Sequence, residues 1–111
     1  MSTDFAFWKD GSGDPLEIFD DLAEGDTGRL VANSAVLRFR EELLSRLPDV
    51  KDELSPPDFE LEENPEDAEK YVLLTLGYRQ LDYLDDILDL AKAHGLVGYS
   101  GVAGEPISFE E

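Results

Sequence analysis

The chain of 111 residues has no cysteine, one histidine, and nine lysines and arginines against 27 aspartates and glutamates. Without cysteine, disulfides, thiolate metal ligands and cysteine nucleophiles are excluded. The shortage of bases leaves a formal net charge of -18, which repels nucleic acids and anionic membranes and favours basic protein partners. Solubility and adaptation to salt explain the same acidity, and the sequence leaves these alternatives open.

Long apolar runs are also missing. No stretch approaches the roughly 20 apolar residues that span a bilayer, and the opening MSTDFAFWKD lacks the pattern of a signal peptide. We therefore expect a cytoplasmic protein without membrane association. Hydrophobic residues nevertheless make up 41% of the chain, which is enough for a packed core, and the length predicts one domain over residues 1–111.

The pattern over residues 71–100 predicts a strand, a helix and a second strand. Tyr71–Tyr78 (YVLLTLGY) is almost continuously apolar, Gln80–His94 carries apolar side chains on one side of a helix, and Leu96–Tyr99 is a short apolar run. Tight turns on both sides of the helix predict two parallel strands joined by a right-handed crossover. This βαβ unit is the predicted centre of the fold.

Three further elements are expected before that unit. Thr3–Trp8 is apolar on both faces, which is typical of an interior strand. Asp14, followed by proline, predicts the start of one helix, and a cap at Asn33 or Ser34 predicts a second helix that Pro48 ends. The sequence therefore predicts an α+β domain: a mixed sheet of three to four strands with about three helices, mainly on one face.

The segment from Asp49 to Glu69 differs in composition, with ten acids, one base and three prolines. We expect an exposed connection that buries little. Phe59 and Leu61 alternate with acids, which would allow a short edge strand at Phe59–Leu61. The residues Ile107–Phe109 would allow another strand near the C-terminus. The sequence decides neither.

The polar side of the last predicted helix carries four aspartates at i, i+3, i+4 and i+7, which places their carboxylates along one face: Asp82, Asp85, Asp86 and Asp89. Like charges at this spacing weaken a helix by about a few tenths of a kcal/mol per pair. Three interpretations stay open: a solvated face, a contact surface for a basic protein, or oxygen ligands for a divalent cation. We take the four as candidate partner-binding residues and predict neither a metal site nor a cofactor.

Other polar residues give weaker signals. His94, in the last turn of this helix, suits a structural role at the helix C-terminus. Asp10, Ser12, Asp14 and Asp21 resemble part of a calcium loop, but a proline stands where that loop needs glycine. No serine or threonine lies in a nucleophile context, so we expect no enzymatic activity.

The opening strand DFAFW, the run YVLLTLGY and the closing AKAHGLVGY form a pattern that covers most of the chain. It resembles small acidic bacterial proteins, frequent in actinobacteria, whose last helix runs into His-Gly-Leu-Val, one residue, then Tyr. Some of these proteins are thought to act as immunity proteins beside toxins, and the resemblance implies such a role without catalytic residues. Those proteins continue with Asp-Pro, whereas Ser100 and Gly101 follow Tyr99 here, so a function of that turn is not implied.

The leading hypothesis is a non-enzymatic protein-binding domain, an immunity- or antitoxin-like inhibitor of a basic partner. One alternative is a structural component that self-associates through the tail carrying Ile107 and Phe109. Another is a divalent-cation-binding protein. The sequence leaves the oligomeric state undetermined.

Overall fold

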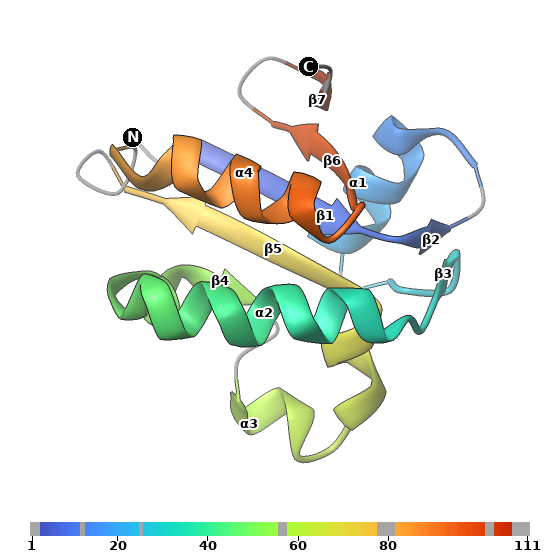
Figure 1. The fold of residues 1–111 in the computed structure, drawn as a ribbon. Coiled ribbons are helices and arrows are strands. Elements are labelled where there is room, and N and C mark those ends of the chain that lie inside the picture. Colours follow the sequence, from blue (N-terminus) through green and yellow to red (C-terminus); the bar gives the residue numbers. More distant parts are fainter. Residues whose placement is uncertain are drawn as a thin grey trace.

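A computed structural model of the chain describes residues 3–11, 13–24, 26–55, 58–77, 82–101 and 104–107. Five strands form one sheet in the order β4-β5-β1-β6-β7 (Figure 1). Their bounds are β1 Thr3–Trp8, β4 Leu54–Ser55, β5 Tyr71–Leu76, β6 Val97–Ser100 and β7 Glu105–Ile107. A separate two-stranded ribbon pairs β2 (Asp10–Gly11) with β3 (Leu30–Val31).

Strand β1 lies at the centre of the sheet, as its composition predicts. Phe5 and Phe7 belong to the core on one face, and Ala6 and Trp8 to the core on the other, all of them buried. Successive side chains of a strand point to opposite faces, so both faces of β1 are covered, and β5 and β6 pair with its two edges. The prediction of an interior strand is confirmed.

The predicted βαβ unit is present in a split form. Strands β5 and β6 are both antiparallel to β1 and therefore run parallel to each other, joined by α4 (Leu84–Ala93). Strand β1 is inserted between them, and the outer pairs β4–β5 and β6–β7 are antiparallel as well. Every neighbouring pair in this sheet is therefore antiparallel, and the sheet has five strands instead of a mixed three or four. Local periodicity identifies strands but does not reveal which distant strand is inserted between two others.

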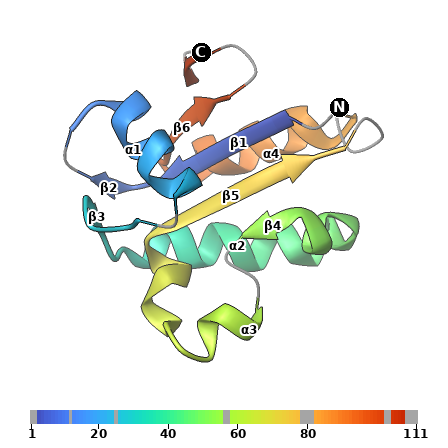
Figure 2. The same ribbon diagram turned by 180° about the vertical axis from the view of Figure 1, so that it is seen from behind.

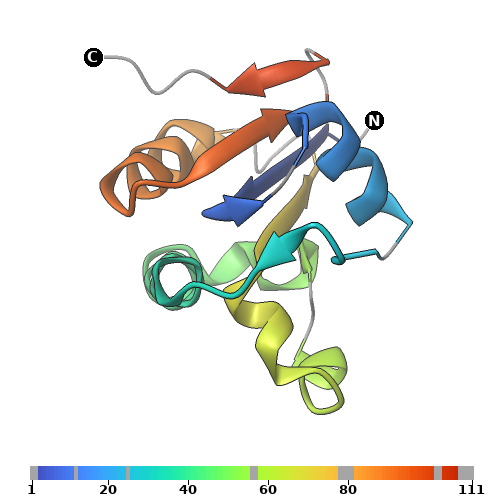
Figure 3. The ribbon, with the colours of Figure 1, turned by 90° about the vertical axis from the view of Figure 1, so that its right-hand side faces the viewer.

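Helices cover both faces of the sheet. Helices α2 (Ser34–Arg46) and α4 lie over the face with the larger core, and α1 (Pro15–Ala23) lies over the opposite face, as Figures 2 and 3 show from behind and from the side. Each helix points an apolar side at the sheet because its hydrophobic residues recur at helical spacing. The arrangement leaves α2 and α4 as neighbours on one surface.

The helix starts follow the capping signals in part. The side chain of Asn33 accepts a hydrogen bond from the Ala35 amide at 2.8 Å, so Asn33, and not Ser34, caps α2. Asp14 occupies the N-cap position of α1, but its side chain makes no capping hydrogen bond. Its backbone oxygen accepts from the Ile18 amide at 3.0 Å, and Pro15 fills the first turn, where no amide is needed.

The acidic segment after α2 is less exposed than its composition predicts. It forms two 3-10 helices, η1 (Pro48–Glu53) and η2 (Pro65–Glu69), with β4 and the short helix α3 (Asp58–Leu61) between them. Three of its apolar residues are buried, with Val50 0%, Leu54 3% and Ala68 6% exposed, and Leu61 is half-buried. The edge strand forms at β4, where Leu54 lies opposite Leu74, so the strand considered at Phe59–Leu61 is wrong.

At the C-terminal end of the described chain, Ile107 closes the edge strand β7, while Phe109 lies outside the described residues. In the part of the chain that the structure describes, no helix is both long and apolar enough to cross a membrane.

Candidate functional site

The four aspartates predicted as contact residues lie along the outer side of α4, and we call them the acidic face. Three belong to α4 itself and the first to the helical turn before it: Asp85, Asp86, Asp89 and Asp82. All four are exposed, and within the described residues none forms a hydrogen bond or an ion pair. The opposite side of α4 is buried through Ile87, Leu90 and Ala91. The structure therefore places the acidic face toward solvent with its carboxylates available.

A groove lies beside part of the acidic face, between α2 and α4. It has a volume of about 460 Å³ and is lined by Glu42, Arg46, Leu47, Asp86, Asp89, Leu90 and Ala93. The two helices run antiparallel, side by side (Figure 1). The α2–α4 groove thus combines three apolar side chains with three carboxylates and one guanidinium. Of the acidic face, Asp86 and Asp89 line it, whereas Asp82 and Asp85 do not.

His94 connects the two helices at one end of the groove. Its Nε2 lies 2.9 Å from Glu42 Oε1, and the second oxygen of Glu42 lies 3.2 Å from Arg46 Nη2. The hydrogen bond from His94 is the main cause that lowers the pKa of Glu42, with the charge of Arg46 assisting and desolvation opposing. The ring of His94 also meets Phe39 edge-on, with centroids 6.2 Å apart.

His94 lies at the C-terminus of α4, as its position in the sequence indicates, but its side chain bonds to a residue of another helix. As the C-cap residue of α4 it donates its backbone amide to Leu90, and Gly95 follows with a φ of 68°. The partner Glu42 comes from another helix, so sequence spacing could not reveal it. The one local signal in this region was the i,i+4 spacing of Glu42 and Arg46.

A second polar contact joins the two helices at the other end of the groove. Tyr83 Oη donates a hydrogen bond to Asp49 Oδ2 at 3.0 Å, linking the start of α4 to η1 just after α2. This bond to a carboxylate raises the pKa of Tyr83, because ionising the phenol would place two negative charges together. The groove residues fall between these two contacts on both helices, so its width is set from both ends.

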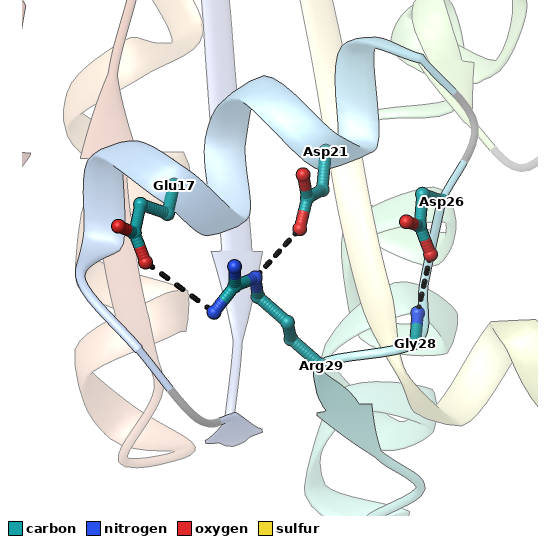
Figure 4. A network of polar contacts seen from close by, with 5 residues as sticks. All are labelled: Glu17, Asp21, Asp26, Gly28 and Arg29. Atoms are coloured by element: carbon teal, nitrogen blue, oxygen red, sulfur yellow. Dashed lines mark hydrogen bonds and ion pairs between the residues drawn. The ribbon is translucent and has the colours of Figure 1, made fainter.

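Some acids elsewhere on the surface are paired with the scarce bases. Arg29 contacts Asp21 through Nε at 2.8 Å and Glu17 through Nη1 at 3.3 Å, and the two carboxylates raise its pKa (Figure 4). Nearby, Asp26 accepts a hydrogen bond from the Gly28 amide at 2.8 Å. These contacts hold the loop before β3 against α1. Within the described residues, no cation forms an ion pair with the acidic face in this way.

The residues that resemble part of a calcium loop make other contacts. Asp10 accepts a hydrogen bond from the Asn33 side chain at 2.8 Å, Asp21 pairs with Arg29, and Ser12 lies outside the described residues. Among the residues that are described, no group of three or more histidines, aspartates and glutamates is arranged to hold a metal ion.

What the site can do chemically follows from its groups. Exposed carboxylates accept hydrogen bonds from guanidinium and ammonium groups, and the apolar residues of the groove can pack against aliphatic or aromatic side chains. No family model, curated protein or solved structure matches the chain. The resemblance to acidic bacterial immunity proteins therefore stays a prediction.

Proposed function

We propose that the chain is a non-enzymatic, cytoplasmic protein-binding domain that recognises a basic partner through the acidic face of α4, as an immunity- or antitoxin-like inhibitor would. The observation that carries the proposal is the concentration of unpaired carboxylates on one side of one helix. The four carboxylates of the acidic face follow each other at i, i+3, i+4 and i+7, and all are exposed and bond to no described residue. A cationic partner would supply the missing charges.

The spacing of the acidic face supports action at physiological salt. Side chains at i,i+3 and i,i+4 lie about 5–6 Å apart, which is less than the Debye length of about 8 Å at roughly 0.15 M ionic strength. Neighbouring carboxylates therefore present a combined charge to an approaching cation, whereas more distant acids are screened. The overall charge of -18 adds steering over longer range, mainly at low salt. The same field disfavours nucleic acids.

The test is association with a candidate basic partner, and the first to try is the protein encoded next to this one. Affinity would be measured by isothermal titration calorimetry for the wild type and a variant in which all four aspartates become asparagine. A matched control removes four exposed acids on other elements: Asp20, Glu24, Glu62 and Glu63. We expect the first variant to lose at least tenfold in affinity, about 1.4 kcal/mol, and the control to lose far less.

Two results would count against the proposal. Equal losses in both variants would mean that only total charge matters, and unchanged binding in the first variant would mean that the contact lies elsewhere. Circular dichroism of each variant would confirm that α4 is retained.

Self-association through the C-terminal edge has less support. Strand β7 is only three residues long, and Pro106 at its middle has no amide hydrogen to donate to another strand. Short edge strands with proline and charge are a common protection against edge-to-edge pairing. Light scattering of the chain with and without residues 101–111 would decide: a monomer in both cases removes the idea.

A further inference from the structure

We infer that the α2–α4 groove is the docking site for a short, basic, amphipathic helix of the partner. This inference rests on the proposed function and deepens it by naming the chemistry of the partner segment. Apolar side chains of the segment pack on Leu47 and Ala93, above the largely buried Leu90, while arginine or lysine side chains beside them pair with Asp86 and Asp89.

The length and shape of the groove fit a helix. On α4 its lining residues run from Asp86 to Ala93, and these seven residue steps span about 10 Å at 1.5 Å per residue. That is about two helical turns, which is the span of anchors at i, i+3, i+4 and i+7. Ala93 keeps the groove open because its exposed side chain is a single methyl group.

The charges that line the groove determine which sign of charge the partner segment must carry. Glu42 is already engaged on both oxygens, by His94 and by Arg46. Asp86 and Asp89 are not engaged by any described residue. Two carboxylates thus remain along one wall of a partly apolar groove, and complementarity requires a segment with positive charge beside its apolar side.

The groove is also formed in the absence of a partner. Its two helices are connected at both ends and share the core beneath, where Phe39, Leu43 and Ile87 are fully buried. A segment that enters a preformed groove need not order it, which lowers the cost of binding.

Among the described residues that line this groove, Arg46 is the one cation. Its side chain is 65% exposed and pairs only with Glu42 among the described residues, at 3.2 Å. A positively charged segment would be repelled by this guanidinium until it moves aside. Replacing it, as Arg46→Gln, should strengthen binding by about threefold, in the range of one exposed charge pair.

The experiment uses a fluorescein-labelled peptide of about 14 residues, with leucines at i, i+3, i+4 and i+7 flanked by lysine and arginine, titrated with the full chain and followed by anisotropy. A peptide of the same composition in scrambled order is the control. Two double variants remove the same charge from one helix: D86N/D89N changes the groove, and D82N/D85N does not. Ala93→Phe fills the groove without changing charge.

We expect D86N/D89N to weaken binding by about tenfold, D82N/D85N by less than about threefold, and Ala93→Phe by about tenfold with an unchanged circular dichroism spectrum. The scrambled peptide should bind weakly. Equal losses in the two double variants with normal binding by Ala93→Phe would overturn the groove but leave the proposed function standing. Equal binding of the scrambled peptide would also overturn the groove. If removing all four aspartates changed nothing, both would fall.

Discussion

Asp89→Asn is predicted to stabilise the fold while weakening binding. Asp89 lies beyond the first turn of α4, four residues after Asp85 and three after Asp86, so it faces two like charges without the benefit of the helix N-terminus. Each such pair costs about 0.2–0.5 kcal/mol, and the opposite charge of Lys92, three residues further on, offsets about one of them. Because asparagine and aspartate have similar helix propensities, the substitution should raise the free energy of unfolding by about 0.2–0.5 kcal/mol.

The first-turn aspartates behave differently. Removing Asp86 relieves one repulsion within α4 but loses an attraction to the helix N-terminus of about 0.3–1 kcal/mol, so Asp86→Asn should be neutral or slightly destabilising. It therefore serves as the control for Asp89→Asn. Comparing the two variants shows whether Asp89 lowers the stability of the fold while its neighbour Asp86, in the same helix, does not.

Thermal unfolding at low ionic strength measures the difference. The expected gain corresponds to a rise in Tm of about 1–3 °C for Asp89→Asn in a chain of this size. In about 1 M salt the Debye length falls to about 3 Å, and the gain should largely vanish. A loss of stability for Asp89→Asn at low salt, or a gain that does not change with salt, would refute the reasoning.

Three further predictions concern the core and its connections. Phe39→Ala removes a fully buried ring that lies 5.4 Å from the ring of Phe7. It should lower the free energy of unfolding, measured in urea, by about 3–5 kcal/mol. A much smaller loss would contradict the central place of Phe39 in the core. Gly13→Ala should lower Tm, because the φ of 103° disfavours a side chain and the new Cβ would lie 2.6 Å from Arg29 Nη1; an unchanged Tm would argue against that loop conformation. The pKa of Glu42 is lowered in the fold, so its contribution to stability is present above its ordinary value of 4.5 and is lost as the pH falls through the lowered value. The wild type should therefore exceed Glu42→Gln in unfolding free energy at neutral pH, and the difference should shrink in acid; a difference independent of pH would be contrary to this.

The sequence predicts the central elements because their signals are local. The alternate apolar faces of Thr3–Trp8, the run from Tyr71 and the periodic helix after it each reflect which side of one element is buried. The insertion of β1 between β5 and β6 is not local, since it depends on which edges pair across the chain. Spacing alone therefore predicts correctly that β5 and β6 are parallel, but not that β1 lies between them.

The acidic segment after α2 shows how average composition misleads. Its many acids predict exposure, yet Val50 and Leu54 are buried because two well-placed apolar residues are enough to attach a segment to a core. Phe59 belongs to a helix instead of a strand, since alternation over three residues is too short to separate the two periods.

The sequence predicts one part of the candidate site, the acidic face, but not the α2–α4 groove beside it. The helical spacing of the four aspartates places them together on the outer side of α4. The groove beside them requires α2 to pack next to α4, and the contact between His94 and Glu42 depends on that packing. Sequence periodicity says which side of each helix faces the core but not which helices become neighbours.

The association rate constant, measured by stopped flow against ionic strength, tests the central claim most directly. The proteins are the wild type and the variant in which Asp82, Asp85, Asp86 and Asp89 are asparagine, mixed with the same basic partner. We predict a wild-type rate that is higher at low salt and falls more steeply as salt is added, with the two proteins converging at about 1 M. Equal rates and equal salt dependence for both proteins would contradict the claim that the acidic face of α4 is the contact surface.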